Sequence, residues 1–264
     1  MKKILALIMA ILTAFSMVAV MTSCKEEVKT VTVGYTLYEP MNYKDENGKL
    51  IGFDTELAEK VFGNLGYKVV FKLIDWNNKY VDLNANTIDC IWNGFTANTN
   101  DDDGVARSEK VDFSYNYMKN KQVVVIKEGT EIAAAADLNG KKGAAEKGSA
   151  GETYANSFEG VTVKGVTAQT DALMEVNSGT SQFAVLDEQL AKSMCGKGNY
   201  ASLKIVEDLS SDVEYYAIGF KKGSELTALV NAELDKLAKD GTITTLAKKY
   251  GVENTAVVDY SDQK

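Results

Sequence analysis

The pattern that most restricts the fold of this chain is a regular alternation of strand-like and helix-like stretches. Residues 31–34 and 67–74 are short runs rich in β-branched and aromatic side chains, which are typical of buried strands. Between them, Asp54 stands at a helix N-cap position and is followed by Leu57 and Val61 at helical spacing. Strands that alternate with helices predict an α/β architecture with largely parallel sheets.

The alternation continues along the rest of the chain, so the sequence predicts two similar halves. No glycine- or proline-rich linker separates these halves, and the only proline is Pro40. About 235 residues follow the N-terminal segment discussed below, enough for one large core or two smaller lobes. The further expected strands are 88–95, 122–127, 143–146, 161–166, 183–186 and 215–221, and the further expected helices are 78–86 and those beginning near residues 151, 170, 188 and 224.

Ligands of open α/β sheets bind beyond the carboxyl ends of the strands. The expected strand ends are therefore the places to search for functional side chains, and the residues discussed below follow them. These ends are Gly34, Ile74, Trp92, Glu146 and Leu186.

The composition argues for binding rather than catalysis. Histidine is absent, and 28 of the 29 lysine and arginine residues are lysine, which leaves Arg107 as the single arginine. Without histidine, the usual general base near neutral pH and the commonest metal ligand are missing. Arg107 is the one planar group able to hold a carboxylate by two parallel hydrogen bonds. We expect a small anionic or zwitterionic ligand, with no cofactor and no metal.

The N-terminus resembles a bacterial lipoprotein signal over residues 1–23, where Lys2 and Lys3 precede an apolar run. Cys24 would carry the lipid as the first residue of the mature chain, and residues 24–30 would form an anchor linker. The alternative is an uncleaved membrane helix, because the run is close to the shortest length that spans a bilayer. Lipidation predicts an extracytoplasmic protein, on the outer face of a Gram-positive cell or the periplasmic side in a Gram-negative one.

Charge and cysteine content exclude other partners. Removal of residues 1–23 takes away two lysines and no acid, so the net charge moves from −8 to −10. An acidic chain without basic clusters is a poor partner for nucleic acid and for anionic lipid surfaces. Cys90 and Cys195 remain beside the lipidated cysteine, and because their spacing suggests neither a disulfide nor a metal site, we expect buried free thiols.

Five segments in order resemble the extracellular solute-binding proteins of family 3, which supply polar amino acids to bacterial ABC importers. The resemblance covers about residues 29–252. The segments are 34–43 with 52–54, 88–96, 107–114, 184–188, and 240–242 with 248–250.

This resemblance implies the bilobal periplasmic-binding-protein fold, in which two doubly wound α/β lobes are joined by a two-stranded hinge and enclose the ligand. Residues 31–119 and 214–264 would form lobe 1, and residues 120–213 would form lobe 2. The chain would cross between the lobes near 118–121 and again near 211–215.

The resemblance also implies that Arg107 binds the ligand carboxylate, helped by the Thr96 hydroxyl and the Gly94 backbone. The spacing from Arg107 to Phe113 fits the family pattern. Residues 100–106, which include three consecutive aspartates, read as an insertion upstream of it. The alternative is a surface arginine beside a solvated acidic loop.

Two residues of the second half complete the expected contacts with an amino acid. Asp187 follows strand 183–186 and, by the resemblance, accepts the ligand ammonium; the alternative is a plain helix N-cap. Ser149 belongs to segment 147–151, a candidate anion-binding loop that opens a helix.

Aromatic residues would cover the aliphatic part of the ligand. Tyr38 lies in a turn that resembles the family's aromatic-x-Pro motif, and Trp76 follows the second strand. Trp92 and Asn93 lie on the strand that leads to Gly94. For the aromatic residues, packing in the core is the alternative, and for Trp92 it is as well supported as ligand contact.

The function implied is the substrate-binding component of an ABC importer, a monomer that delivers its amino acid to a membrane permease. One alternative is a sensing module for a membrane receptor, which would use the same pocket. Another is a lyase on this fold, in which Glu39, Asp75 or Asp187 would supply acid–base chemistry. Loop 35–37 lacks the acid found in relatives specific for basic amino acids, which favours a neutral or polar ligand; the alternative is that Glu39 takes the place of that acid.

Overall fold

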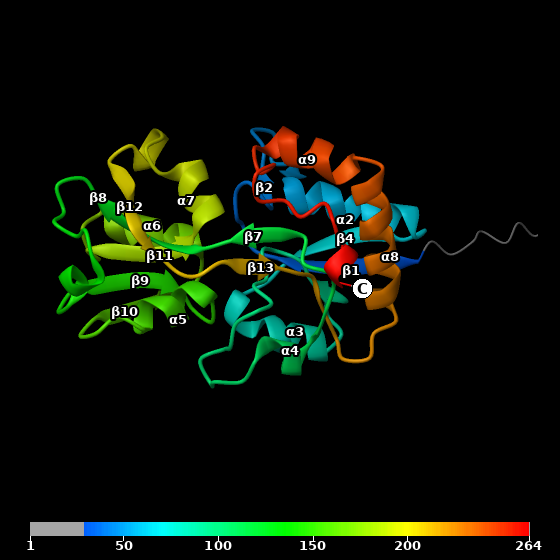
Figure 1. Cartoon of the computed structure of the whole chain (residues 1–264), viewed down its shortest axis with the longest axis horizontal. Helices are drawn as coiled ribbons and strands as arrows, with labels where there is room; N and C mark the ends of the chain where they lie inside the picture. Colours follow the sequence, from blue (N-terminus) through cyan, green and yellow to red (C-terminus); the bar gives the residue numbers. More distant parts are fainter. Residues whose placement is uncertain (1–28, 264) are drawn as a thin grey trace, which may run out of the picture.

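Strand pairing divides the chain between two five-stranded sheets in the computed structural model, which describes residues 29–263 (Figure 1). Lobe 1 is built on the sheet β4-β1-β5-β14-β6. Strand β1 runs parallel to β4 and β5, whereas β14 runs antiparallel to β5 and β6. The bounds are β1 Thr30–Tyr35, β4 Lys68–Leu73, β5 Cys90–Ile91, β6 Asp112–Phe113 and β14 Gly219–Phe220.

Lobe 2 is built on the sheet β10-β9-β11-β8-β12. Strand β9 runs parallel to β10 and β11, whereas β8 runs antiparallel to β11 and β12. The bounds are β8 Gln122–Lys127, β9 Lys142–Glu146, β10 Thr162–Val166, β11 Phe183–Asp187 and β12 Leu203–Ser210.

A two-stranded hinge joins the lobes, with β7 (Met118–Asn120) antiparallel to β13 (Glu214–Tyr216). The structure thus confirms the predicted bilobal α/β fold. The sheets are less parallel than expected, because the strands that leave and re-enter each lobe at the hinge lie antiparallel to their neighbours. The expected strand 215–221 is divided into β13 and β14, since Ala217 and Ile218 pass from the hinge into the sheet of lobe 1.

The C-terminal segment lies along the hinge. The Lys119 N–H donates to the Thr255 carbonyl at 2.8 Å, and the Val257 N–H donates to the Tyr117 carbonyl at 2.8 Å. The Tyr260 ring stacks on a lobe 1 tyrosine and is 1% exposed. Strand β7 therefore has hydrogen-bonded partners on both of its edges.

Helices cover both faces of each sheet. In lobe 1, α2 packs against β4, α8 and α9, because its apolar residues Leu57 and Val61 form one buried face, as predicted. A separate apolar cluster, which includes Leu83, lies on the side of α3. The bounds are α2 Phe53–Asn64, α3 Lys79–Asn84, α4 Arg107–Lys110, α8 Leu226–Lys239 and α9 Thr242–Tyr250.

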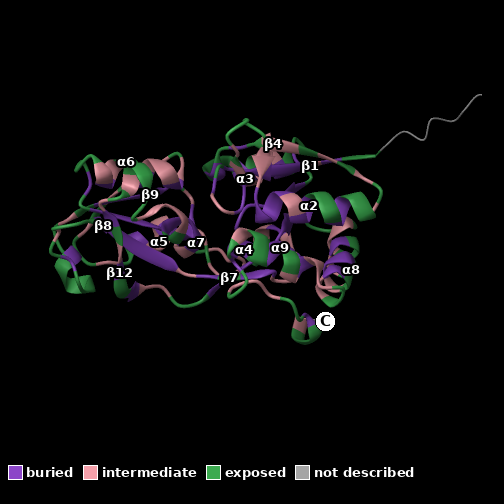
Figure 2. Ribbon diagram, turned by 90° about the horizontal axis from the view of Figure 1, so that it is seen from above, coloured by how far each residue is buried: buried purple, intermediate pink, exposed green. Residues whose placement is uncertain are grey.

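In lobe 2, α6 and α7 share one apolar cluster with the sheet and α5 belongs to another, because alternate residues of β8 face opposite ways: Val123 and Val125 one way, Val124 the other. Figure 2 shows buried residues following the central strands and the inner helix faces. The bounds are α5 Ala150–Asn156, α6 Gln169–Asn177 and α7 Glu188–Met194; shorter elements are β2 Tyr43–Lys44, β3 Leu50–Ile51, η1 Trp76–Asn78, η2 Ala135–Leu138, η3 Gly198–Tyr200 and η4 Ser261–Gln263.

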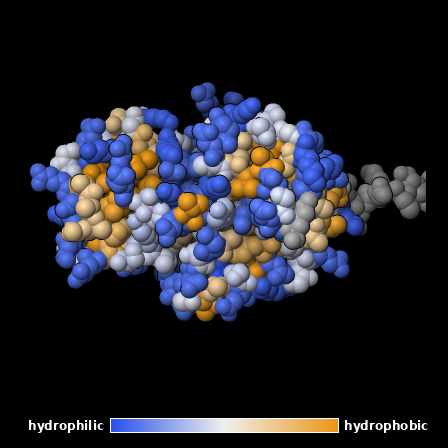
Figure 3. Space-filling view, in the orientation of Figure 1, coloured by the Kyte–Doolittle hydropathy of each residue, from blue (hydrophilic) through white to orange (hydrophobic). Residues whose placement is uncertain are grey.

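The surface is mostly hydrophilic in Figure 3, with apolar residues gathered in small patches over both lobes. Within residues 29–263, no helix combines the length and the apolar character needed to cross a bilayer. The predicted signal segment and Cys24 lie outside the described residues.

Candidate functional site

The two lobes meet around an enclosed pocket to which each contributes five lining residues. The free space inside is about 10 Å³, close to that of one water molecule. The lobes are therefore closed on each other, and a bound amino acid would hold them further apart. The lining residues are Trp76, Asn93, Gly94, Thr96 and Arg107 from lobe 1, and Glu146, Ser149, Ala150, Gln169 and Asp187 from lobe 2.

Arg107, the first residue of α4, is 1% exposed, which excludes the alternative of a surface arginine. Its Nε donates to Asp101 Oδ1 at 2.8 Å, Nη1 to the Thr96 carbonyl at 3.2 Å and Nη2 to the Gly148 carbonyl at 3.4 Å. Because a guanidinium carries five N–H groups, one donor remains on each terminal nitrogen. Those two donors suit the two oxygens of a carboxylate.

The insertion at residues 100–106 holds Arg107 in the pocket. Asn100 and Ala106 pair across it, and its Asp101 also accepts from Lys110 Nζ at 2.8 Å. Burial raises the pKa of Asp101, but the neighbouring Arg107 and Lys110 cations outweigh it and hold the pKa at about 2. Asp101 is therefore an ionised partner that orients the guanidinium and compensates its charge.

Asp187 ends β11 and reaches the pocket from lobe 2. Its side chain makes no capping hydrogen bond to helix α7, so it is not a plain N-cap. Oδ1 accepts from Asn120 Nδ2 and Gln122 Nε2 at 2.6 Å each, and Oδ2 accepts from Gln169 Nε2 at 2.5 Å. Burial raises the pKa of Asp187 although these amides lower it. The carboxylate is positioned by neutral groups, which leaves its charge uncompensated.

The hinge contributes a second buried carboxyl, Glu214 of β13. Its Oε2 accepts from Thr96 Oγ1 at 3.1 Å and from Gln122 Nε2 at 2.9 Å. Burial, and then the charge of Asp187, raise the pKa of Glu214 to about 7. The predicted Thr96 hydroxyl thus connects the pocket to the hinge in this closed form.

Gly94 and Asn93 form the lobe 1 floor of the pocket. Gly94 has φ 57°, and a Cβ there would lie 2.6 Å from the Tyr38 ring, so only glycine fits. Its N–H donates to Asp54 Oδ2 at 3.1 Å rather than into the pocket, where a carboxylate donor was expected. The Asn93 amide donates to Asn42 Oδ1 at 2.7 Å, which secures the turn that carries Tyr38.

Of the three predicted aromatic contacts, the pocket lining contains only Trp76. Tyr38 lies behind Gly94, and its hydroxyl is 2.7 Å from that of Tyr216. Trp92 packs in the core, with its ring centroid 5.9 Å from that of Phe62. Contact of Tyr38 or Trp92 with a ligand stays a prediction that requires a more open pocket.

The loop before α5 forms part of the interface between the lobes. Ser149 lines the pocket, and its Oγ accepts from the Glu152 N–H at 3.0 Å as the helix N-cap. Across the interface, Lys79 Nζ donates to the Gly148 carbonyl at 2.9 Å. Burial, and then the charge of Arg107, lower the pKa of Lys79 to about 7.

Three lining residues were not predicted: Glu146, Ala150 and Gln169. Glu146 ends β9, the same kind of strand end that pointed to Asp187, so its position alone could have identified it. Gln169 opens α6 and orients Asp187, which no local sequence signal indicates.

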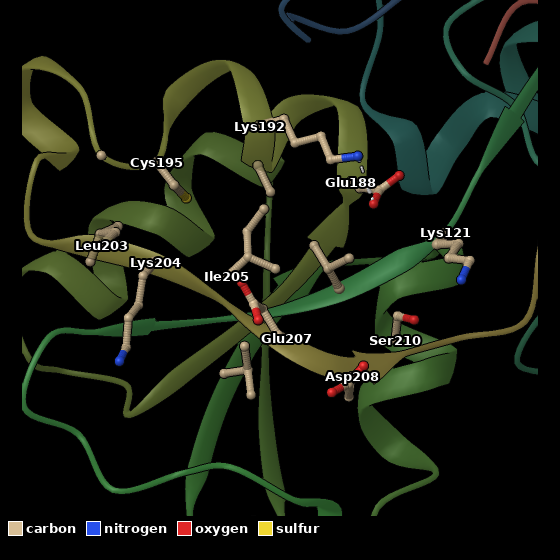
Figure 4. Close-up of a pocket in the computed structure, with 14 residues that line it drawn as sticks. Lys121, Glu188, Lys192, Cys195, Leu203, Lys204, Ile205, Glu207, Asp208 and Ser210 are labelled. Carbon is tan, nitrogen blue, oxygen red and sulfur yellow. Dashed lines mark ion pairs between the residues drawn. The ribbon is translucent and has the colours of Figure 1, made fainter. Parts of the chain in front are cut away.

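A larger hollow of about 680 Å³ lies on lobe 2 between α7 and β12 (Figure 4). Lysine and acidic side chains surround it, and Lys192 and Glu188 form an ion pair at 2.8 Å. It contains none of the predicted ligand residues, so we place the functional site between the lobes.

Known proteins are similar to this chain in sequence and in fold. The profile described as bacterial extracellular solute-binding proteins, family 3, matches residues 31–253. The L-cystine-binding protein TcyA of Bacillus subtilis (strain 168) is 30% identical over 235 residues, covering 88% of this chain and 84% of that protein.

Two solved structures are similar over 84% of this chain. One, described as an ancestral arginine-binding protein bound to arginine, has a TM-score of 0.77, 33% identity and 97% of its own chain covered. The other, described as the ancestral amino acid-binding protein AncCDT-1, a precursor of cyclohexadienyl dehydratase, has a TM-score of 0.74, 30% identity and 95% coverage.

Proposed function

This chain belongs to the bacterial extracellular solute-binding proteins of family 3, and we propose that it captures an amino acid between its lobes and delivers it to the membrane permease of an ABC importer. One observation carries the proposal: Arg107 and Asp187, from different lobes, line one enclosed pocket. A guanidinium with two free donors matches a carboxylate, and an uncompensated carboxylate matches an ammonium.

Ligand capture would stabilise the closed arrangement, because each lobe supplies part of the contacts. The interface already contains direct bonds between the lobes. Thr153 Oγ1 of α5 donates to Asp102 of the insertion at 2.9 Å, and Ser193 Oγ of α7 donates to the Glu39 carbonyl at 3.1 Å. A ligand that bridges Arg107 and Asp187 would link the lobes in the same way, in a closed form held further apart than this one.

The experiment is isothermal titration of the purified protein, stripped of bound ligand by partial unfolding and dialysis, against the standard amino acids and cystine. Micromolar or tighter binding of one or a few of them supports the proposal. A folded sample that binds none of them contradicts it. Loss of uptake of the same amino acid in cells that lack the protein separates transport from sensing, since a pure sensor leaves uptake intact.

We also propose that the chain is not an enzyme and that it acts as a monomer held at the membrane by lipid on Cys24. The sequence contains no histidine, and Asp187 is engaged by three amides instead of being poised to move a proton. The family is extracellular, and lipid attachment would raise the local concentration of the binding protein beside its permease.

A further inference from the structure

One carboxyl oxygen in the interlobe pocket has no hydrogen-bond partner among residues 29–263. Glu146 is 2% exposed and lines the pocket at the end of β9. Its Oε1 is fully buried and has no hydrogen-bond partner among residues 29–263. An ionised carboxylate buried in this way is costly unless a cation or several donors meet it.

The cations near Glu146 are engaged elsewhere. Lys79 Nζ donates to the carbonyls of Gly148 at 2.9 Å and Trp76 at 3.4 Å. The Arg107 guanidinium is paired with Asp101 at 2.8 Å. Burial raises the pKa of Glu146 well above its usual range and Asp187 raises it further, whereas Lys79 lowers it. No described residue thus donates a hydrogen bond to Glu146 Oε1, which leaves that role to a ligand group in the pocket.

The charges that face the pocket do not balance for a simple zwitterion. With Lys110 assigned to Asp103, two cations, Arg107 and Lys79, stand against three carboxylates, Asp101, Asp187 and Glu146. A zwitterionic amino acid brings one charge of each sign and leaves the excess of one carboxylate unchanged. A second cation, at the end of the ligand side chain, would compensate it.

We propose that Glu146 selects amino acids whose side chain ends in a cation, an ammonium or a guanidinium; this rests on the function proposed above. Glu146 is then the specificity-determining residue and lies on lobe 2, so the side-chain cation becomes buried only when the lobes close around the ligand. The proposal departs from the preference for neutral or polar ligands drawn from loop 35–37.

The test compares ligands that differ in little more than charge. Titrations with arginine and citrulline, and with lysine and norleucine, are made on the wild-type protein, on Glu146→Gln and on Glu188→Gln. The control Glu188 is also an acid of lobe 2, but it pairs with Lys192 outside this pocket. Thermal melts establish that all three proteins are folded.

We expect the cationic member of at least one pair to bind the wild-type protein at least tenfold more tightly than its neutral counterpart. Glu146→Gln should weaken that cationic ligand at least tenfold and change the neutral one less than threefold, while Glu188→Gln changes neither beyond twofold. Equal binding within both pairs by the wild-type protein overturns the proposal, even if Glu146→Gln does not fold.

Two further results distinguish this inference from the function on which it rests. Binding of neutral or acidic amino acids alone overturns the role of Glu146 and leaves the amino-acid-binding function standing. Equal weakening of cationic and neutral ligands by Glu146→Gln also overturns the role of Glu146, because this residue would then support the pocket without distinguishing ligands by their charge. Failure of the folded wild-type protein to bind any amino acid contradicts the function itself.

Discussion

Replacement of Arg107 by lysine tests the central contact of the proposed site. In the structure, three of its five N–H groups bind Asp101, Thr96 and Gly148, which leaves one donor on each terminal nitrogen for a carboxylate. A lysine ammonium cannot keep these contacts and also present two parallel donors. The ligand carboxylate therefore loses at least one hydrogen bond to a charged group, which contributes about 2 kcal/mol.

A loss of about 2 kcal/mol corresponds to about 30-fold weaker binding, to be measured by isothermal titration with the tightest amino acid found for the wild-type protein. The matched control is Lys72→Met, which removes a lobe 1 cation that pairs with Asp82 outside the pocket lining. This control should change the affinity less than threefold. If Arg107→Lys binds within twofold of the wild-type protein, Arg107 does not hold the carboxylate.

Three other changes test separate parts of the structure. Asp187→Asn should weaken amino acids at least tenfold while a carboxylate analogue without the amino group is affected much less; equal losses would make Asp187 structural. Burial raises the pKa of Asp54 to about 7, so between about pH 4 and about pH 7 this group is protonated in the folded protein but ionised in the unfolded chain. The free energy of unfolding therefore falls as the pH rises from about 4 to about 7, by on the order of 4 kcal/mol. The free energy of unfolding, measured by urea denaturation across that pH range, should decline less for Asp54→Asn than for the wild-type protein. Parallel pH dependences of the two proteins would refute the raised pKa. Cys24→Ala should release the protein from the membrane fraction, and unchanged fractionation would indicate a spanning N-terminal helix.

Local sequence patterns predicted individual helices and strands, whereas the two-lobed arrangement came from the family resemblance. The spacing of Leu57 and Val61 predicted the buried face of α2, and the run 122–127 predicted β8, because helical and strand periodicities follow from side-chain direction within one element. Strand ends also pointed to Asp187 and Trp76, which line the pocket. Arg107 was a candidate for the carboxylate contact because it is the single arginine of the chain, and the family resemblance pointed to the same residue.

Tertiary structure decided which of these residues face the same space. Tyr38 and Trp92 were also predicted to contact the ligand, with core packing as the alternative, and their contacts with Tyr216 and Phe62 keep them out of the pocket lining. Asp101 became the partner of Arg107 only because the insertion folds back on itself. That Glu146 Oε1 has no hydrogen-bond partner in the described part of the chain follows from how the two lobes pack around the pocket. Such contacts join residues far apart in the chain, so no local sequence pattern predicts them.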